Sequence, residues 1–376
     1  MTVVFISNYY NHHQAPFCQV MSNLLKENFV FIQTQEMEEE RSSMGWGDID
    51  LPAYVIKSYS NAFAEKECRR IIEQADVVII GSAPNHFVKN RIKDGKIVIR
   101  YSERPLKKGL ELWKYPYRYL KWHIMYPRHA NVYLLCASAY TASDYLKFGL
   151  FRDRCYKWGY FPEIKNYCNV SAMIERKRPA SILWVARLIE LKHPELPIMV
   201  AKRLKEEHYS FEMNLIGSGI LENKIKTMIR EYCLEDCVKM LGTMKPNQVR
   251  EHMEQSQVFL FTSDRNEGWG AVLNEAMNSA CGVVASDAIG SVPYLIRHGD
   301  NGLIYRDGDF NDLYCKLKQL LDAPDRTAML GQRAYETMTN IWNGKVAAER
   351  LLKLVKLLLK GETDLGIYED GPCSKA

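Results

Sequence analysis

Short apolar runs alternate with helical patterns along almost the whole chain, and this alternation restricts the fold more than any other feature. In the first half, apolar runs at 3–7, 29–34, 77–81, 96–99 and 134–137 have the length and composition of strands. Strands that alternate with helices are typical of βαβ units, which build a parallel sheet covered on both faces. The sequence therefore predicts an α/β protein.

The alternation stops once, between residues 167 and 179. Residues 169–178 are polar and end in a charge run, and a second strand–helix series begins at Ser181. A chain of 376 residues is long enough for two domains. We therefore expect an N-terminal domain over 1–172, a linker over 173–180, a C-terminal domain over 181–340, and, over 341–376, a helix that packs back toward the N-terminal domain and a frayed tail.

The expected fold is a pair of Rossmann-like, doubly wound domains that face a central cleft. Sheets of this kind bind ligands outside the carboxyl ends of their strands, where the strand order reverses. Functional residues are therefore expected in the loops that follow strands.

Composition and the chain ends favour a cytoplasmic protein. Net charge is +5, which is too small by itself to indicate a nucleic-acid partner. The N-terminus lacks the basic and apolar regions of a signal peptide, and no run of about 18 apolar residues is present to span a membrane. The ten cysteines lack metal-binding spacing, so we interpret them as reduced, small, buried side chains.

Residues 259–277 carry the strongest chemical signal. An apolar strand ends in a polar turn that contains Gly268 and Gly270, and a helix follows. The glycines allow the backbone to approach a ligand closely, and the free N–H groups of the helix favour an anion. Glu267 and Glu275 flank this position, and carboxylates accept hydrogen bonds from sugar hydroxyls. From the residues alone, a nucleotide-sugar site and a pair of structural surface acids are equally open.

The segment from Glu267 to Glu275 resembles the Glu-x7-Glu motif of the family-4 retaining glycosyltransferases, or glycosyltransferase group 1, which have the GT-B fold. Segments 285–293 and 298–304 follow in the order and spacing of that family. The resemblance is strong over 181–305 and only architectural over the first 170 residues. It implies that Glu267 contacts the donor sugar and that Glu275 binds the ribose hydroxyls. It also implies donor contacts along the backbone of Gly268, Trp269, Gly270, Ala271 and Val272.

Residues 183–194 resemble the family segment in which an arginine and a lysine hold the donor diphosphate. In this chain they are Arg187 and Lys192, and Ala186 stands where the family usually has glycine. Arginine forks onto phosphate oxygens, and lysine adds a point charge. Two further segments resemble the family: a glycine turn at Gly217 and the strand end at Met240 and Leu241. The resemblance implies that the backbone of the strand end holds the base of the donor. A turn role alone stays open for the glycine.

These residues imply a metal-independent reaction without a cofactor. Negative charge that develops on the leaving diphosphate would be stabilised by Arg187, Lys192 and the helix start near Gly270. Two Asp-x-Asp triplets, 48–50 and 307–309, are interpreted as structural. No carboxylate pair suits a double displacement, so the expected mechanism is a front-side substitution that retains the anomeric configuration.

The acceptor half carries weaker signals. His12, His13 and Gln14 follow the first strand, where many relatives have a glycine-rich loop. We expect them to contact donor phosphate or acceptor hydroxyls, with polar capping of the next helix as the alternative. Glu103 follows the strand at 96–99, where many relatives carry a histidine, and is the candidate polar group there. Its alternative is a structural pairing with Arg104.

Residues 104–128 contain seven Lys or Arg, one Glu, two Trp and four Tyr. This mixture suits an anionic membrane surface. It also suits single-stranded nucleic acid, but the donor-site motifs make that partner the weaker interpretation. We therefore expect peripheral binding to the inner face of the cell membrane, where a lipid-linked acceptor is presented, and no nucleic-acid partner.

Together these features predict a glycosyltransferase that moves a hexose or N-acetylhexosamine from a nucleotide-sugar, with UDP as the leading nucleotide and GDP as the alternative. The predicted acceptor is a glycan or a lipid-linked oligosaccharide in surface or extracellular polysaccharide biosynthesis. Two alternatives remain. A GT-B-like sugar-nucleotide epimerase would need no acceptor, and a nucleotide-sugar-binding protein would have no transferase activity.

Overall fold

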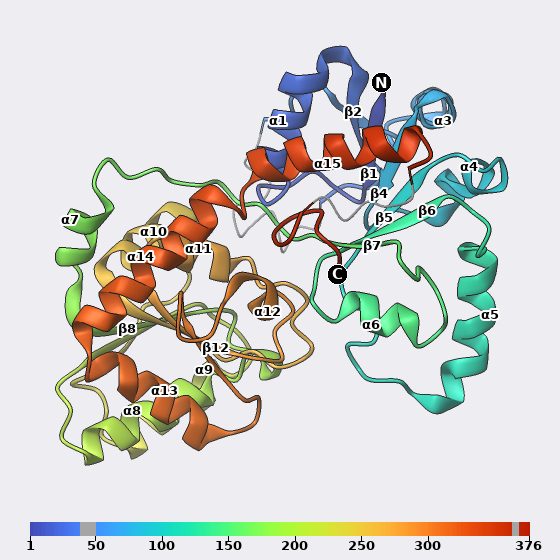
Figure 1. Ribbon diagram of the computed structural model, residues 1–376. Helices are drawn as coiled ribbons and strands as arrows, with labels where there is room; N and C mark the ends of the chain where they lie inside the picture. The colour runs from blue at the N-terminus through green and yellow to red at the C-terminus, as the bar shows by residue number, and fades with distance from the viewer. Residues whose placement is uncertain (38–49, 363–367) are drawn as a thin grey trace. The chain divides into compact units, whose positions relative to one another are not determined.

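The computed structural model describes residues 1–37, 50–362 and 368–376 and divides into two compact units (Figure 1). The first unit comprises Met1–Glu163 and Trp342–Ala376, and the second comprises Ile164–Ile341. The expected linker at 173–180 lies inside the second unit, where it holds the end of helix α7 (Val170–Glu175) and the start of strand β8 (Arg178–Val185). No residue of α7 is buried, whereas Lys177, in the charge run that follows, is buried.

A parallel sheet of seven strands forms the centre of the first unit, in the order β3-β2-β1-β4-β5-β6-β7. Strands β1 and β4 are buried along their whole length, which explains why they read as unbroken apolar runs. The strands are β1 (Val3–Ser7), β2 (Phe29–Gln33), β3 (Val55–Lys57), β4 (Val77–Ile80), β5 (Val98–Ser102), β6 (Val132–Cys136) and β7 (Cys155–Lys157). The helices are α1 (Ala15–Leu25), α3 (Ala62–Gln74), α4 (Lys89–Lys93), α5 (Tyr115–Met125), α6 (Thr141–Leu146) and α15 (Gly344–Leu359).

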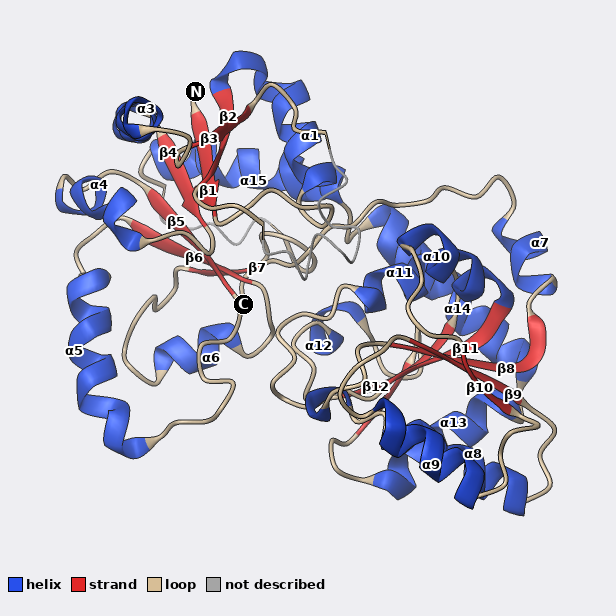
Figure 2. Ribbon diagram, turned by 180° about the vertical axis from the view of Figure 1, so that it is seen from behind, coloured by secondary structure: helices blue, strands red, loops and turns tan. Residues whose placement is uncertain are grey.

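The second unit has a parallel sheet of six strands, in the order β10-β9-β8-β11-β12-β13. Helices α8, α9 and α13 cover one face, and α10, α11 and α14 cover the other (Figure 2). Besides β8, the strands are β9 (Glu212–Ile216), β10 (Val238–Met240), β11 (Ser256–Phe261), β12 (Gly282–Ser286) and β13 (Leu303–Tyr305). Besides α7, the helices are α8 (Glu195–Glu206), α9 (Glu222–Glu231), α10 (Pro246–Gln255), α11 (Val272–Asn278), α12 (Val292–Leu295), α13 (Phe310–Leu321) and α14 (Pro324–Asn340).

Both sheets are doubly wound. In each, the strand formed first lies inside the sheet, and later strands add on both of its sides. The prediction of two Rossmann-like α/β domains is confirmed by this topology.

Helix α15 lies along α1 in the first unit (Figure 1). It begins at Gly344, three residues after the expected start, because the side chain of Asn343 accepts a hydrogen bond from the Val346 backbone and caps the helix. Gly344 lets the two helices approach closely, since a Cβ atom there would lie 2.9 Å from the backbone nitrogen of Phe17.

The expectation of a frayed tail is wrong for residues 368–376, the last described segment of the chain. Lys375 forms an antiparallel bridge to Tyr156 in the edge strand β7, and Asp370 pairs with Lys157 at 2.9 Å. Cys373 is fully buried. The tail is too short and polar to show a periodic pattern, and it is ordered by contacts with an edge strand that sequence alone does not reveal.

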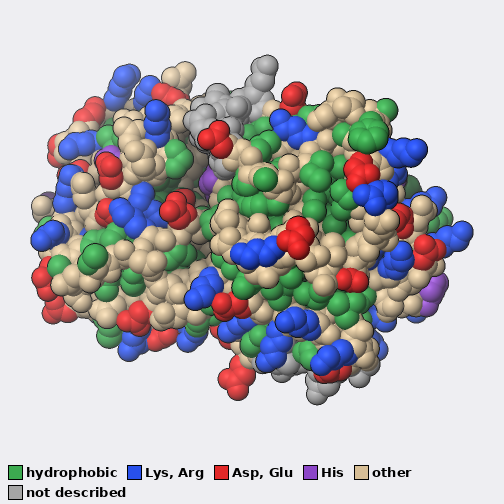
Figure 3. Space-filling view, turned by 90° about the horizontal axis from the view of Figure 1, so that it is seen from above, with side chains coloured by type: hydrophobic (Ala, Val, Ile, Leu, Met, Phe, Trp, Pro, Cys, Tyr) green, Lys and Arg blue, Asp and Glu red, His purple; other side chains and the backbone are tan. Residues whose placement is uncertain are grey.

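The surface charges are mixed in sign, and the cysteines are buried only in part. Basic and acidic side chains are interspersed over the face drawn in Figure 3. No helix formed by the described residues is long and apolar enough to cross a bilayer. Six cysteines are buried as expected, whereas Cys168, Cys233 and Cys315 are exposed.

Candidate functional site

The carboxyl ends of β8 and β11 mark the place where the strand order of the second sheet reverses. Strand β8 pairs with β9 on one side and with β11 on the other, and the chain reaches β11 only after forming β9 and β10. Doubly wound sheets bind ligands at this place. Arg187 and Lys192 follow β8, and the segment from Glu267 to Gly270 follows β11.

Lys192 and Glu267 form an ion pair between these two loops. Their side chains are 14% and 13% exposed, so the pair is largely withdrawn from solvent while its outer edge remains accessible. The amine of Lys192 also lies 5.9 Å from the ring centre of Phe261. Two residues that were predicted separately, from two motifs, therefore meet in one site.

A network of backbone and side-chain hydrogen bonds fixes these loops. The hydroxyl of Thr262 donates to the carbonyl of Lys192 at 2.7 Å and accepts from the indole Nε1 of Trp184 at 2.9 Å. The backbone N–H of Asp264 donates to the carbonyl of Leu191 at 3.0 Å. Thr262 and Asp264 were not predicted as site residues. Their positions directly after β11 are the only sequence signal for them.

Gly270 turns the chain from the Glu267 loop into α11. Its φ angle is 78°, in the left-handed region, and a Cβ atom there would overlap the ring of Phe261. Trp269 points inward: its side chain is fully buried, and its indole Nε1 donates to Asn274 at 2.9 Å. A donor contact at this residue is thus restricted to its backbone. Ala271 is the N-cap residue of α11, and Val272 begins the helix.

Glu275 lies in the first turn of α11 and is partly exposed. Burial raises the pKa of its carboxyl group above the ordinary value, and the charge of Arg250 acts in the opposite direction. Arg250 donates to the backbone carbonyl of Glu275 at 3.2 Å and to the side chain of Asn278 at 2.9 Å. Arg250 was not identified from the sequence, because it lies on α10, outside the matched motifs.

Gly217 serves as a packing position. Its φ angle is 137°, and a Cβ atom there would overlap the carbonyl oxygen of Ala186, so the turn after β9 packs tightly on the loop after β8. Arg187, in that loop, is exposed. Met240 ends β10, and Leu241 follows it, with its N–H bonded to the carbonyl of Leu215 at 2.9 Å. These predicted donor residues thus share the carboxyl edge of one sheet.

In the first unit, the predicted acceptor residues are brought together by a residue that the sequence analysis missed. Tyr160 donates a hydrogen bond to Glu103 at 2.6 Å, and its ring is parallel to that of His13, with the ring centres 5.8 Å apart. The rings of His12 and His13 are 3.8 Å apart, and Gln14 is buried. Burial lowers the pKa of His12 from 6.5 to about 4. Tyr160 follows β7 and belongs to no motif.

Strand β5 extends to Ser102, beyond the expected end at 99, because it pairs with β6 up to Cys136. Glu103 is therefore the first residue after the strand. The alternative pairing of Glu103 with Arg104 is wrong: Glu103 binds Lys107 at 2.6 Å, whereas Arg104 binds the buried Asp144 on α6.

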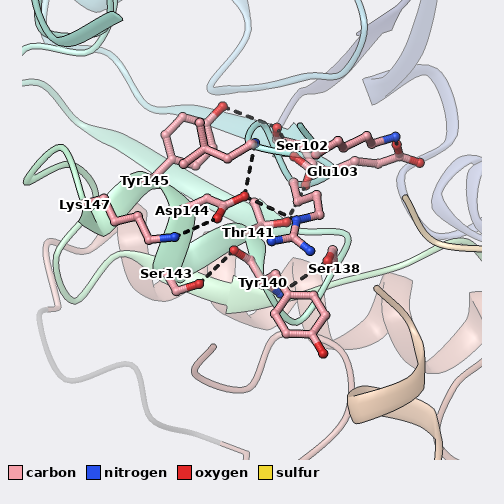
Figure 4. Close-up of polar contacts among 12 residues, drawn as sticks. Ser102, Glu103, Ser138, Tyr140, Thr141, Ser143, Asp144, Tyr145 and Lys147 are labelled. Atoms are coloured by element: carbon pink, nitrogen blue, oxygen red, sulfur yellow. Dashed lines mark hydrogen bonds and ion pairs between the residues drawn. The ribbon is translucent and has the colours of Figure 1, made fainter. Parts of the chain in front are cut away.

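Asp144 holds the loop that carries Glu103 (Figure 4). It accepts a hydrogen bond from the backbone N–H of Leu106 at 3.1 Å and lies 3.4 Å from both Arg104 and Lys147. A buried carboxylate with these partners fixes the direction in which the chain leaves β5.

The Asp-x-Asp triplet at 307–309 has a structural contact, because Asp309 caps α13 by accepting a hydrogen bond from the Asp312 backbone at 3.0 Å. In the other triplet, residues 48 and 49 lie outside the described residues. Among the residues that the structure describes, no three His, Cys, Asp or Glu side chains are grouped as metal ligands.

Residues 172–337 match the model of a protein family described as glycosyl transferases group 1. The amylovoran biosynthesis glycosyltransferase AmsK of Erwinia amylovora is 31% identical over 186 residues, which cover 48% of this chain and 46% of AmsK. The putative colanic acid biosynthesis glycosyltransferase WcaL of Escherichia coli is 31% identical over 188 residues, with the same two shares. The chain thus spans about half the length of the curated relatives it matches.

Solved structures resemble the chain over nearly its whole length. HepE from Anabaena, crystallised with UDP, aligns with a TM-score of 0.69 at 12% identity and covers 95% of this chain and 100% of its own. TarM from S. aureus, crystallised with UDP and other ligands, aligns with a TM-score of 0.65 at 13% identity. The alignment covers 96% of this chain and 99% of TarM. At these identities the likeness shows the fold alone, and the predicted GT-B class is confirmed.

Proposed function

We propose that this chain, whose residues 172–337 match the glycosyl transferases group 1 family, is a retaining glycosyltransferase that uses a nucleotide-sugar donor. The observation that carries the proposal is the contact between Lys192 and Glu267 at the carboxyl ends of β8 and β11. A cation suited to a diphosphate and a carboxylate suited to sugar hydroxyls meet where a doubly wound sheet binds its ligand. We infer that a bound donor separates the pair and takes a contact with each side chain.

In the proposed reaction, the bond between the anomeric carbon and the diphosphate oxygen breaks, and an acceptor oxygen forms a bond to the same face of that carbon. The proton of the acceptor hydroxyl passes to the leaving phosphate, which conserves both charge and atoms. Arg187 and Lys192 stabilise the negative charge that develops on the diphosphate. Because these side chains supply the positive charge, we propose that the transfer needs no divalent ion.

The proposed donor is a UDP-hexose or UDP-N-acetylhexosamine. UDP is favoured by its presence in the crystal structures of HepE and TarM. The proposed acceptor is a glycan or a lipid-linked oligosaccharide of a surface or extracellular polysaccharide, which the similarity to glycosyltransferases of amylovoran and colanic acid biosynthesis favours. We place acceptor contacts at Glu103, His12, His13 and Gln14, and the enzyme on the cytoplasmic face of the cell membrane.

The test is hydrolysis of a panel of UDP- and GDP-sugars in the presence of EDTA. Glu275→Ala is compared with the wild type, and Glu336→Ala, an exposed glutamate on α14, serves as the matched control. We expect release of one nucleotide that resists EDTA, is lost in Glu275→Ala and is kept in Glu336→Ala. With an acceptor, NMR of the product should show the anomeric configuration of the donor.

Two results would overturn the proposal. If no donor binds and no nucleotide is released, the site is not a nucleotide-sugar site. If a changed sugar nucleotide is formed without an acceptor, the protein is an epimerase.

A further inference from the structure

Helix α5 has two apolar faces, and only one of them is packed against the protein. On the inner face, the ring of Tyr115 stacks on Phe148 with centres 4.7 Å apart, and Trp122 lies 4.6 Å from the same ring. Tyr115, Trp122 and Met125 are partly buried against the core of the first unit. This face connects the helix to the core of the first unit.

The outer face carries a second row of large apolar side chains. Trp113, Tyr117, Leu120 and Ile124 are 78%, 66%, 63% and 71% exposed. They follow one another at intervals of four, three and four residues, so they form one stripe along the helix and the turn before it. We call these four residues the outer stripe. Figures 1 and 2 show α5 at the outer margin of the first unit, away from α1 and α15.

The concentration of apolar side chains at this place is unusual for a monomer surface. Among the described residues, thirteen large hydrophobic side chains are exposed, and six of them lie between Leu112 and Ile124. Isolated exposed hydrophobic residues need no explanation, but a contiguous apolar patch marks an interaction surface.

The charges around the outer stripe are basic. The one acidic residue of 104–128 is Glu111, and it is already paired with Lys114 at 2.6 Å and Arg118 at 2.7 Å. Lys108 and Lys121 have no carboxylate partner among the described residues. Arg128, shortly after the helix, lines a cavity of about 390 Å³ together with Arg152 and Arg154. A partner of this surface must therefore be apolar where it meets the stripe and anionic around it.

We propose that the outer stripe of α5 inserts into the interface of an anionic lipid bilayer, with the helix parallel to the membrane plane. Trp and Tyr favour the headgroup level, Leu and Ile reach the acyl chains, and lysines beside them attract anionic lipids. An α-helix of this length covers about 16 Å of membrane surface. This surface gives the peripheral location proposed above a physical basis, although binding to vesicles needs neither donor nor acceptor.

The experiment measures binding of the full chain to phosphatidylcholine vesicles with and without phosphatidylglycerol, in the absence of substrates. We expect binding that requires phosphatidylglycerol and weakens as salt rises. The fluorescence of Trp113, obtained as the difference between the wild type and Trp113→Phe, should shift to the blue on binding and be quenched by brominated lipids. The double variant L120S/I124S should bind at least about tenfold more weakly.

The matched control is F63S/L24S, which removes two exposed apolar side chains from other helices of the same unit. It should bind vesicles as the wild type does. Circular dichroism and donor hydrolysis in solution test whether each variant is folded. Because vesicle binding is measured without substrates, a loss of binding can be distinguished from a loss of activity. Unchanged binding of L120S/I124S, equal binding to neutral vesicles, or a concentration-dependent dimer that buries Trp113 would each overturn the proposal.

Discussion

Lys192 and Glu267 lie 75 positions apart in the chain and form an ion pair at the edge of the second sheet. In the proposed reaction each would contact the nucleotide-sugar, and in the pair each neutralises the charge of the other. The pair therefore keeps two charges in a site that is largely withdrawn from solvent, where an unpaired charge would be costly.

We predict that Lys192→Met lowers kcat by about 10²–10³-fold, because in the proposed reaction the lysine stabilises charge on the leaving diphosphate. The measurement is kcat at saturating donor and acceptor. Lys226→Met is the control, since Lys226 pairs with Glu222 at 2.6 Å on the exposed surface of α9 and such pairs contribute little. A kcat for Lys192→Met within about twofold of the control would remove the lysine from the mechanism.

Gly270 and Gly299 allow the cost of crowding to be separated from the cost of backbone strain. Both have left-handed φ angles, 78° and 82°, but only at Gly270 would a Cβ atom meet another residue, the Phe261 ring. Gly299→Ala should cost about 1–2 kcal/mol of unfolding free energy. Gly270→Ala should cost a further ~1–3 kcal/mol, because the ring must move.

Urea denaturation of both glycine variants gives the comparison, with the midpoint and its slope recorded together. Equal losses in the two variants would show that the Phe261 ring yields freely and that Gly270 is needed only for its backbone angle.

The meeting of the proposed donor residues at one sheet edge could be predicted because it depends on local sequence and one topological rule. Lys192 and Glu267 each follow an apolar strand, and the carboxyl ends of parallel strands share one edge of a sheet. Their direct contact could not be predicted, since it depends on how two loops of different length return to the same point. Trp269 shows the same limit, because its position in a motif does not reveal that its side chain points inward.

For the proposed acceptor residues, the sequence predicted only their positions after strands and not their contacts. Glu103 was located after its strand, but its partners Lys107 and Tyr160 were not, and Tyr160 lies 57 positions away. No periodic pattern links the loops after β5 and β7, so only the folded chain brings them together. The same applies to α5, whose aromatic and basic composition was visible while its division into a packed and an exposed face was not.

Acidification should destabilise the protein through His12. Burial lowers its pKa in the folded state to about 4, compared with 6.5 in the unfolded chain. Between these values the unfolded state binds a proton that the folded state does not. The stability that depends on a neutral His12 is therefore fully present above about pH 6.5 and is lost as pH falls toward 4. At pH 5 the loss from this residue should be about 1–2 kcal/mol.

The measurement is the free energy of unfolding at pH 7 and pH 5 for the wild type and His12→Asn. The variant should show the smaller drop. His193 acts in the opposite direction, because its hydrogen bond to Glu195 raises its pKa, but it is present in both proteins and cancels in the difference. An equal drop in both proteins would mean that His12 is protonated as easily in the folded state as in the unfolded chain.

Asp144 should control both stability and use of the acceptor, since it is 1% exposed and holds the loop that presents Glu103 (Figure 4). Asp144→Asn leaves the 9%-exposed Arg104 without a charged partner, which should cost about 3 kcal/mol. Lys147→Met removes a partner that is 48% exposed and should cost less than about 1 kcal/mol. Because Glu103 would shift with the loop, Asp144→Asn should also raise the KM for acceptor while the KM for donor stays constant. An equal rise in both KM values would assign Asp144 a purely structural role.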